Sequence, residues 1–184
     1  MYYTQERSGL IRDSGLGLFH ICYGSGVGKT TRAVGLAIRA AGAGLRVDFV
    51  QFMKSGKSSE VALFDFIANI YYWCPGEHPF ILSRAPDGVH YEHAERAFEC
   101  ALNAINSGTN LLICDELLDT ILFGLIKEKL VVEMIKKCRK RTELILTGRD
   151  ASSKMLELAD YVTEFVQVKH PYYSGARARK GIEY

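Results

Sequence analysis

The sequence has few of the features that mark secreted or zinc-binding proteins. Its five cysteines include no C-x-x-C pair: they are Cys22, Cys74, Cys100, Cys114 and Cys138. An odd count without metal-ligand spacing argues against a disulfide framework and a zinc site, and it favours reduced thiols in the cytoplasm. Residues 1–15 are polar and lack the apolar stretch of a signal peptide. We therefore predict a cytoplasmic protein.

Long apolar runs and a large excess of one charge are also missing. No run approaches the roughly 20 residues that a membrane helix needs. The formal net charge is only +2, so no strong positive field points to nucleic acid as a partner. A hydrophobic content of 48% with 24% charged residues is typical of a globular domain. We expect one domain over 1–184, with neither nucleic acid nor a membrane as its partner.

Short apolar runs alternate with helix-like segments along the chain. The runs cover 18–23, 46–52, 70–73, 110–114, 143–147 and 161–168. Predicted helices cover 29–43, 59–69, 90–107, a stretch ending at 140, and 152–159. Strands that are apolar throughout and separated by helices indicate a parallel sheet covered on both faces. This pattern predicts a doubly wound α/β fold with about six mainly parallel strands, an N-terminal extension over 1–16 and a surface tail over 169–184.

The stretch CYGSGVGKTT (22–31) joins the first predicted strand to the first predicted helix. The standard phosphate-loop pattern, G-x-x-x-x-G-K-[ST], has a glycine where this chain has Tyr23. Gly24, Gly26 and Gly28 still allow the backbone to curl into a nest of N–H groups at a helix N-terminus, which favours anions. Lys29 is placed to reach the terminal phosphates.

The hydroxyl of Thr30 is placed to ligate Mg²⁺. The alternative is a strand-to-helix turn that merely needs glycine, with Lys29 as a solvated charge. A preceding buried strand, the GKTT sequence and a following helix favour the phosphate loop. It is the feature that predicts a P-loop NTPase domain of RecA-like architecture.

Polar residues also follow two later strands. LLICDE (111–116) ends in Asp115 and Glu116, either of which could hold Mg²⁺ directly or through water. The alternative is that Asp115 only caps the following helix. LTGR (146–149) places Arg149 at the same edge of the sheet, where ligands of such folds bind. Arg149 is therefore predicted to contact phosphate, and a plain surface arginine is the alternative.

These motifs together resemble the ATP:corrinoid adenosyltransferases of the cobalamin pathway. The resemblance rests on YGSGVGKTTRA (23–33), GLAIRAAGAGLRVDFVQFMKSG (35–56), CDEL (114–117) and TGR (147–149). The most distinctive part is the ending, LELADYVTEFVQVKHPYYSGARARKGIEY (156–184), which is similar to the family's ELADLVTE…VKHP…GIEF. The family also lacks glycine at the position of Tyr23. The similarity spans 18–184, nearly the whole chain.

The resemblance implies an unusual use of a phosphate loop. A reduced Co(I) corrinoid, cobalamin or cobyrinic acid a,c-diamide, attacks C5′ of ATP and releases triphosphate. It also implies Mg²⁺, a homodimer and an electron-donating flavoprotein. Lys29 and Arg149 would act on the leaving group, and Mg²⁺ would sit between Thr30 and Glu116 with Asp115 nearby. The ATP-binding positions carried over from the family are Gly24, Ser25, Gly26, Val27, Gly28, Lys29, Thr30, Thr31 and Arg39.

The chain departs from the family pattern at several positions. Val27 replaces a lysine, and Leu82, within PFILS (79–83), stands where the family has a tryptophan that presses on the corrin. Phe80 keeps an aromatic side chain in that stretch, and packing in the core is its alternative role. Two other functions therefore stay open. One is a P-loop ATPase or phosphotransferase, and the other is a diverged nucleotide- or corrinoid-binding protein without turnover, for which Val27 and Leu82 are the best support.

Overall fold

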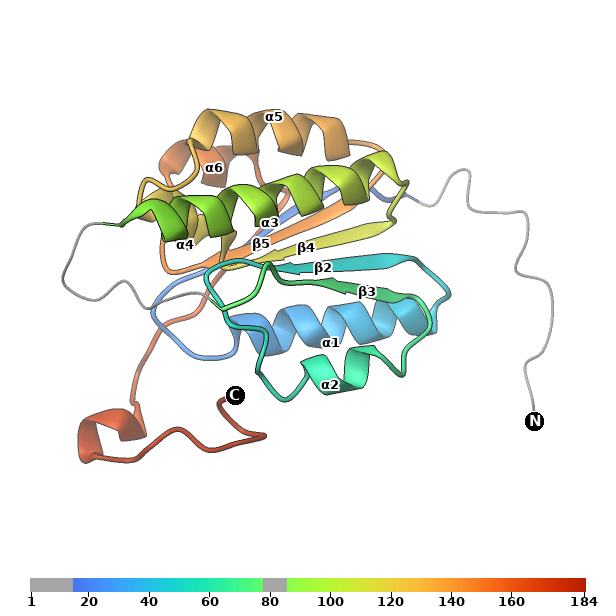
Figure 1. The fold of residues 1–184 in the computed structure, drawn as a ribbon. Helices are drawn as coiled ribbons and strands as arrows, with labels where there is room; N and C mark the ends of the chain where they lie inside the picture. Colours follow the sequence, from blue (N-terminus) through green and yellow to red (C-terminus); the bar gives the residue numbers. More distant parts are fainter. Residues whose placement is uncertain (1–14, 78–85) are drawn as a thin grey trace, which may run out of the picture.

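A six-stranded parallel sheet forms the centre of the protein (Figure 1). The computed structural model describes residues 15–77 and 86–184. The sheet order is β3-β2-β4-β5-β1-β6, and every neighbouring pair is parallel. The predicted doubly wound α/β fold with about six strands is confirmed. The strands are β1 (Phe19–Tyr23), β2 (Val47–Gln51), β3 (Ile70–Trp73), β4 (Leu111–Asp115), β5 (Glu143–Gly148) and β6 (Tyr161–Glu164).

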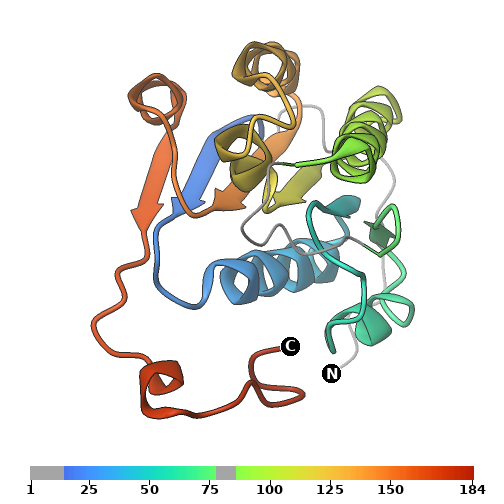
Figure 2. The same ribbon diagram turned by 60° about the vertical axis from the view of Figure 1, so that its left-hand side comes forward.

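Helices cover both faces of the sheet, which is why its inner strands are mostly apolar. Helices α1 and α2 lie on one face and the other four lie on the opposite face (Figures 1 and 2). Neighbouring residues of β2 show this division, since Phe49 packs in the α1 core and Val50 in the opposite core. The helices are α1 (Lys29–Gly42), α2 (Val61–Phe64), α3 (Gly88–Asn106), α4 (Leu117–Leu122), α5 (Glu128–Cys138) and α6 (Ser153–Leu158).

Two predicted helices differ from the observed ones. Of the helix predicted over 59–69, only the single turn α2 forms. The chain after it makes turns with hydrogen bonds to the third residue back, such as the one from Phe66 N–H to Leu63 O, so the α-helix does not continue. The stretch predicted as helical up to 140 is divided into α4 and α5. It breaks at Gly124, whose φ of 71° lies in the left-handed region.

The last strand is shorter than the predicted run over 161–168. The backbone of Phe165 still donates to Tyr23 O at 2.7 Å, but its carbonyl accepts from Gly26 N–H, also at 2.7 Å. The chain thus leaves the sheet to cover the glycine loop. It then forms a short 3₁₀ turn (Pro171–Ser174) and passes below α1, so that its end lies near Ser59 (Figures 1 and 2).

Glu143 ties together the amino ends of β1 and β5. Its carboxylate accepts hydrogen bonds from the N–H groups of Gly17 and Leu18, both at 2.9 Å, and lies 2.6 Å from His20 Nε2. Burial acts to raise the pKa of this carboxyl. The hydrogen bonds from His20 and the two N–H groups outweigh burial, so the pKa lies below its usual 4.5.

We expect Glu143→Gln to lower the free energy of unfolding by about 1–3 kcal/mol near pH 7, because three donors lose a charged acceptor. A lowered pKa in the folded state means that this stabilisation is complete above the unfolded-state pKa and is lost as the pH falls through the folded-state pKa. Urea unfolding at about pH 7 and about pH 3 measures the difference between the two proteins. A difference that is the same at both pH values would contradict this account.

The described ranges also show the state of the cysteines and the character of the helices. All five cysteines fall within these ranges and are free thiols. Among residues 15–77 and 86–184, no helix has the length and apolar character to cross a membrane. Of the extension predicted over 1–16, only residues 15 and 16 are described.

Candidate functional site

The glycine loop lies at the carboxyl end of β1 and is packed under the chain that leaves β6. Gly24 N–H donates to Arg149 O at 3.1 Å, and Gly26 N–H donates to Phe165 O. These two donors are therefore used within the protein. Gly24 and Gly28 have φ values of 114° and 106°, which side-chain-bearing residues rarely adopt.

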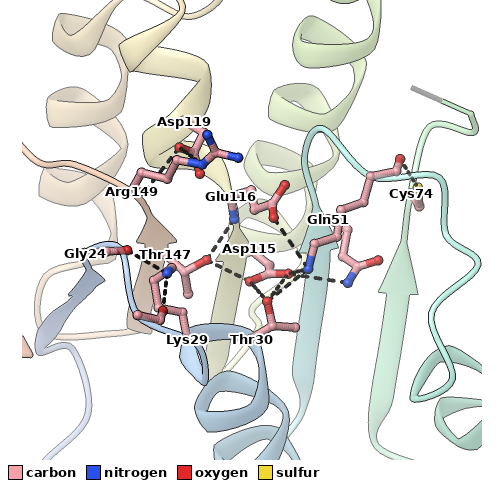
Figure 3. A network of polar contacts seen from close by, with 12 residues as sticks. Gly24, Lys29, Thr30, Gln51, Cys74, Asp115, Glu116, Asp119, Thr147 and Arg149 are labelled. Atoms are coloured by element: carbon pink, nitrogen blue, oxygen red, sulfur yellow. Dashed lines mark hydrogen bonds and ion pairs between the residues drawn. The ribbon is translucent and has the colours of Figure 1, made fainter. Parts of the chain in front are cut away.

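The Lys29 side chain folds back onto the glycine loop. Its Nζ donates to Gly24 O and Gly26 O, both at 2.7 Å (Figure 3). Burial lowers the pKa of Lys29, and the nearby Asp119 and Glu116 carboxylates oppose this shift. The ammonium is thus held at the loop by backbone carbonyls, in a position from which it can turn to an incoming phosphate.

Close packing against the chain leaving β6 explains the glycine at position 26. A Cβ on Gly26 would lie 2.8 Å from the carbonyl carbon of Phe165 and 2.9 Å from that of Val166. We expect Gly26→Ala to destabilise the protein by about 1–3 kcal/mol, because the two backbones must separate. Urea unfolding measures this loss of stability.

The control for this variant is Gly35→Ala, within helix α1. Apart from its chain neighbours and the backbone of its own helix, no heavy atom lies within 4 Å of a Cβ built at Gly35, so this change should raise stability by up to about 1 kcal/mol through helix propensity. Equal effects of the two substitutions would show that contact with Phe165 is not the reason for glycine at position 26.

Asp115 is the centre of a buried polar network at the end of β4. Its side chain is fully buried, and it accepts from Thr147 Oγ1 at 2.7 Å and from Thr30 Oγ1 at 3.0 Å (Figure 3). Lys54 Nζ lies 2.6 Å from Asp115 Oδ2, and Gln51 Nε2 donates to the same oxygen at 3.4 Å. The Asp115 carboxylate, at the end of β4, therefore connects helix α1 with strands β2 and β5.

Glu116 follows in a left-handed conformation, with a φ of 64°. Its N–H donates to Thr147 Oγ1 at 2.8 Å, which fixes this turn of the backbone. Burial raises the pKa of Glu116 to about 7, and the Asp115 charge adds to the shift while Lys54 opposes it. Helix α4 has Glu116 at its N-cap position and has no side-chain cap, so the alternative that Asp115 caps this helix is wrong.

Arg149 stands at the end of β5, beside Asp119. Its N–H donates to Asp119 Oδ1 at 3.2 Å, and its guanidinium Nε lies 4.0 Å from the same oxygen. Burial raises the pKa of Asp119, and the backbone and charge of Arg149 oppose this shift. The arginine side chain itself is 74% exposed, so it can reach a ligand at this edge of the sheet.

A cavity of about 710 Å³, a size that suits a nucleotide-sized ligand, is lined by some of these groups, but Lys29, Asp115 and the glycine loop itself are not among its lining residues. One wall is polar and holds Thr30, Lys54, Glu116 and Arg149. The loop after β2, to which Lys54 belongs, and the end of the tail also contribute to the lining. The remaining lining residues are Thr31, Val34, Met53, Ser55, Gly56, Lys57, Ser58, Ser59, Glu60, Leu63, Asp119, Phe123, Gly181, Ile182, Glu183 and Tyr184.

Some predicted site residues lie apart from this cavity. Arg39 is on an exposed face of α1, ten residues after Lys29 and about 15 Å along the helix axis. Val27 is 71% exposed at the tip of the glycine loop. Ser25 is exposed beside it. Phe80 and Leu82, predicted to face the corrin, are outside the described residues.

Four residues of the site were not predicted: Gln51, Lys54, Asp119 and Thr147. Lys54 follows the second strand, so the rule that ligands bind at the carboxyl ends of strands could have found it. Gln51 is held through a hydrogen bond of 2.7 Å from the Tyr72 hydroxyl, a contact between strands that the sequence does not reveal. Thr147 donates a hydrogen bond to Asp115, and Asp119 accepts one from the Arg149 N–H. Only the fold brings the two members of each pair together.

Comparison with known proteins points in one direction. The model of a family described as ATP:corrinoid adenosyltransferase BtuR/CobO/CobP matches residues 15–184. A corrinoid adenosyltransferase of Pseudomonas aeruginosa is 32% identical, and the alignment covers 91% of this chain and 84% of that protein. Corrinoid adenosyltransferases of a Sinorhizobium species and Escherichia coli K12 are 31% and 30% identical, also over 91% of this chain, with 80% and 86% of their own lengths covered.

Proposed function

The chain belongs to the ATP:corrinoid adenosyltransferase family, and we propose that its glycine loop holds the triphosphate of ATP while C5′ faces a reduced corrinoid. Members of this family transfer the adenosyl group of ATP to a corrinoid, so this protein is a transferase of the cobalamin pathway. The observation that carries the detailed proposal is that Thr30, Glu116 and Arg149 line one cavity at the carboxyl edge of the sheet, with Lys29 next to Thr30 at the start of α1.

In the proposed reaction, Co(I) supplies the electron pair that forms the Co–C5′ bond. The C5′–O bond breaks, its electron pair stays on the oxygen, and that oxygen leaves with the triphosphate. The cobalt is formally oxidised from Co(I) to Co(III). The protein supplies no nucleophile in this reaction, so its contribution is to orient the two substrates and stabilise the charge of the leaving triphosphate.

Lys29 and Arg149 are the cations proposed to stabilise that charge. Lys29 Nζ needs only to exchange two backbone carbonyls for phosphate oxygens. The Arg149 guanidinium is exposed at the same edge of the sheet, where it can pair with a phosphate in bidentate geometry. The loop N–H groups of Ser25, Val27, Gly28 and Lys29 are the proposed backbone donors, since those of Gly24 and Gly26 are already used.

The residues present suit a magnesium ion. Mg²⁺ prefers oxygen ligands and usually keeps water and substrate phosphate among them. Thr30 Oγ1 and the Asp115 carboxylate lie 3.0 Å apart, with Glu116 beside them. Among the described residues, no group of three or more His, Cys, Asp and Glu side chains could hold a metal alone, so phosphate oxygens would complete the coordination. When bound, the ion neutralises phosphate charge.

Four broader proposals follow from the family and the chain itself. We propose a homodimer, an electron-donating flavoprotein as the reductant, and a cytoplasmic location in keeping with the free thiols. We also propose that residues 1–184 form one domain whose tail over 169–184 packs near the site. Its last residues support this, because Tyr184 O accepts from Ser59 Oγ at 2.8 Å and both residues line the cavity.

The test is a transfer assay with ATP and two corrinoids, cobalamin and cobyrinic acid a,c-diamide, under strong reduction. We expect one triphosphate for each adenosyl-corrinoid formed with at least one of them. Release of ADP and orthophosphate without a Co–C product would instead indicate a P-loop ATPase. Binding of ATP and corrinoid without either product would indicate a binding protein that has lost turnover.

A further inference from the structure

Lys54 reaches into the group of oxygens that we propose for magnesium. Its Nζ lies 2.6 Å from Asp115 Oδ2, 2.9 Å from Thr30 Oγ1 and 3.8 Å from Glu116 Oε1. These three side chains form the proposed metal site, and the lysine ammonium contacts or approaches all of them. The side chain of Lys54 is 22% exposed, whereas that of Asp115 is fully buried.

We infer that Lys54 is a tethered cation that balances Asp115 in the nucleotide-free protein and gives up this position when Mg²⁺–ATP binds. The inference rests on the proposed function, because that proposal assigns Mg²⁺ to these oxygens. A buried carboxylate without a partner is strongly destabilising, so Asp115 needs a positive charge beside it in both states. Lys54 supplies this charge before the metal arrives.

The ammonium and the metal cannot share these oxygens. A bound Mg²⁺ lies about 2.0–2.1 Å from its ligands and requires a regular octahedral arrangement. An ammonium hydrogen-bonded to the same Asp115 and Thr30 oxygens would occupy that space and repel the ion. Entry of the metal therefore requires the Lys54 side chain to leave.

The surroundings of Lys54 indicate that its side chain moves and its backbone stays in place. Lys54 O accepts a hydrogen bond from Cys74 Sγ at 3.4 Å, and a Cβ on Gly56 would lie 3.2 Å from the Tyr72 hydroxyl. The backbone on both sides thus packs against the end of β3 and the residue that follows it. The four-carbon side chain can still turn into the cavity, which Lys54 itself lines. There its ammonium would meet the phosphates of ATP.

This exchange makes metal and nucleotide binding depend on each other. Without ATP, Mg²⁺ must displace Lys54 into a cavity that offers the ammonium no phosphate. With ATP bound, the phosphates receive the ammonium and supply further metal ligands. The protein should therefore bind a free divalent ion weakly and the ion with ATP much more strongly.

The test is the affinity of the protein for Mn²⁺ alone, measured by electron paramagnetic resonance without nucleotide or corrinoid. We expect Lys54→Met to bind Mn²⁺ at least about tenfold more tightly than the unaltered protein, because no cation competes for the buried carboxylate. Lys54→Arg, which keeps the charge, should show no such gain. An unchanged or weaker affinity in Lys54→Met would overturn the inference.

Lys57→Met is the matched control, since Lys57 lines the same cavity three residues further along the loop but pairs with the exposed Glu77. Its affinity for Mn²⁺ should not change, and an equal gain would mean that any cation of the loop has this effect. Lys54→Gln, which can still donate a hydrogen bond to Asp115, replaces Lys54→Met if that variant does not fold, with the same gain expected. The result is independent of the transfer assay, so a gain without adenosyl transfer would refute the proposed function alone.

Discussion

Replacing Lys29 with alanine is expected to reduce kcat/KM for ATP in adenosyl transfer by about 100- to 1000-fold, the usual loss when one donor to a developing negative charge is removed. The reason is the position of its ammonium. Nζ is held at the mouth of the glycine loop by Gly24 O and Gly26 O, where the triphosphate is proposed to lie. Val27 adds no second cation to this loop.

The loop itself should survive this change. Gly24 N–H and Gly26 N–H keep their bonds to Arg149 O and Phe165 O, so circular dichroism and urea unfolding should detect only a modest loss of stability. Lys154→Ala on an exposed position of α6 is the control and should leave transfer unchanged. A Lys29→Ala protein that keeps more than a tenth of the activity would contradict the assignment of the triphosphate to this loop.

Replacing Asp115 with alanine is expected to lower the free energy of unfolding by about 3–5 kcal/mol, the cost of breaking a buried ion pair from one side. Lys54 would lose its partner at 2.6 Å, and the hydroxyls of Thr147 and Thr30 would lose their acceptor. The same change removes a proposed magnesium ligand, so Mg²⁺-dependent transfer should fall below detection. Urea unfolding and the transfer assay measure these losses.

Two further variants separate the charge effect from simple loss of packing. Asp65→Ala removes an exposed carboxylate at the end of α2 and should change stability by no more than about 0.5 kcal/mol. Adding Lys54→Met to Asp115→Ala should restore part of the lost stability, because the unpaired cation is then gone. A double variant as unstable as the sum of the single variants would show that the ion pair is not the cause.

The sequence is sufficient to predict the fold because local and global signals agree. Each strand of the sheet coincides with an apolar run, and β3 has the predicted bounds of 70–73. The glycine loop and the acidic end of β4 could also be located, since both lie where an apolar run meets polar residues. Such boundaries depend on burial, which the sequence encodes directly.

The contacts between these segments are harder to predict from the sequence. The predicted last strand is too long partly because Phe165 is apolar for another reason, which is the packing of its ring against Gly28 of the glycine loop. The residues around Asp115 come from four separate segments, and nothing local in QFMKSG indicates that Lys54 will pair with a carboxylate 61 residues away. Pairing of this kind depends on strand order, which local patterns do not determine.

Positional labelling of ATP tests the central claim most directly. The measurement uses ATP with ¹⁸O in the bridge between C5′ and the α-phosphorus, a reduced corrinoid and mass spectrometry of the phosphate products. If the glycine loop holds triphosphate as a leaving group, the C5′–O bond breaks and all of the label appears in triphosphate. Label retained in ADP, together with unlabelled orthophosphate, would contradict this account.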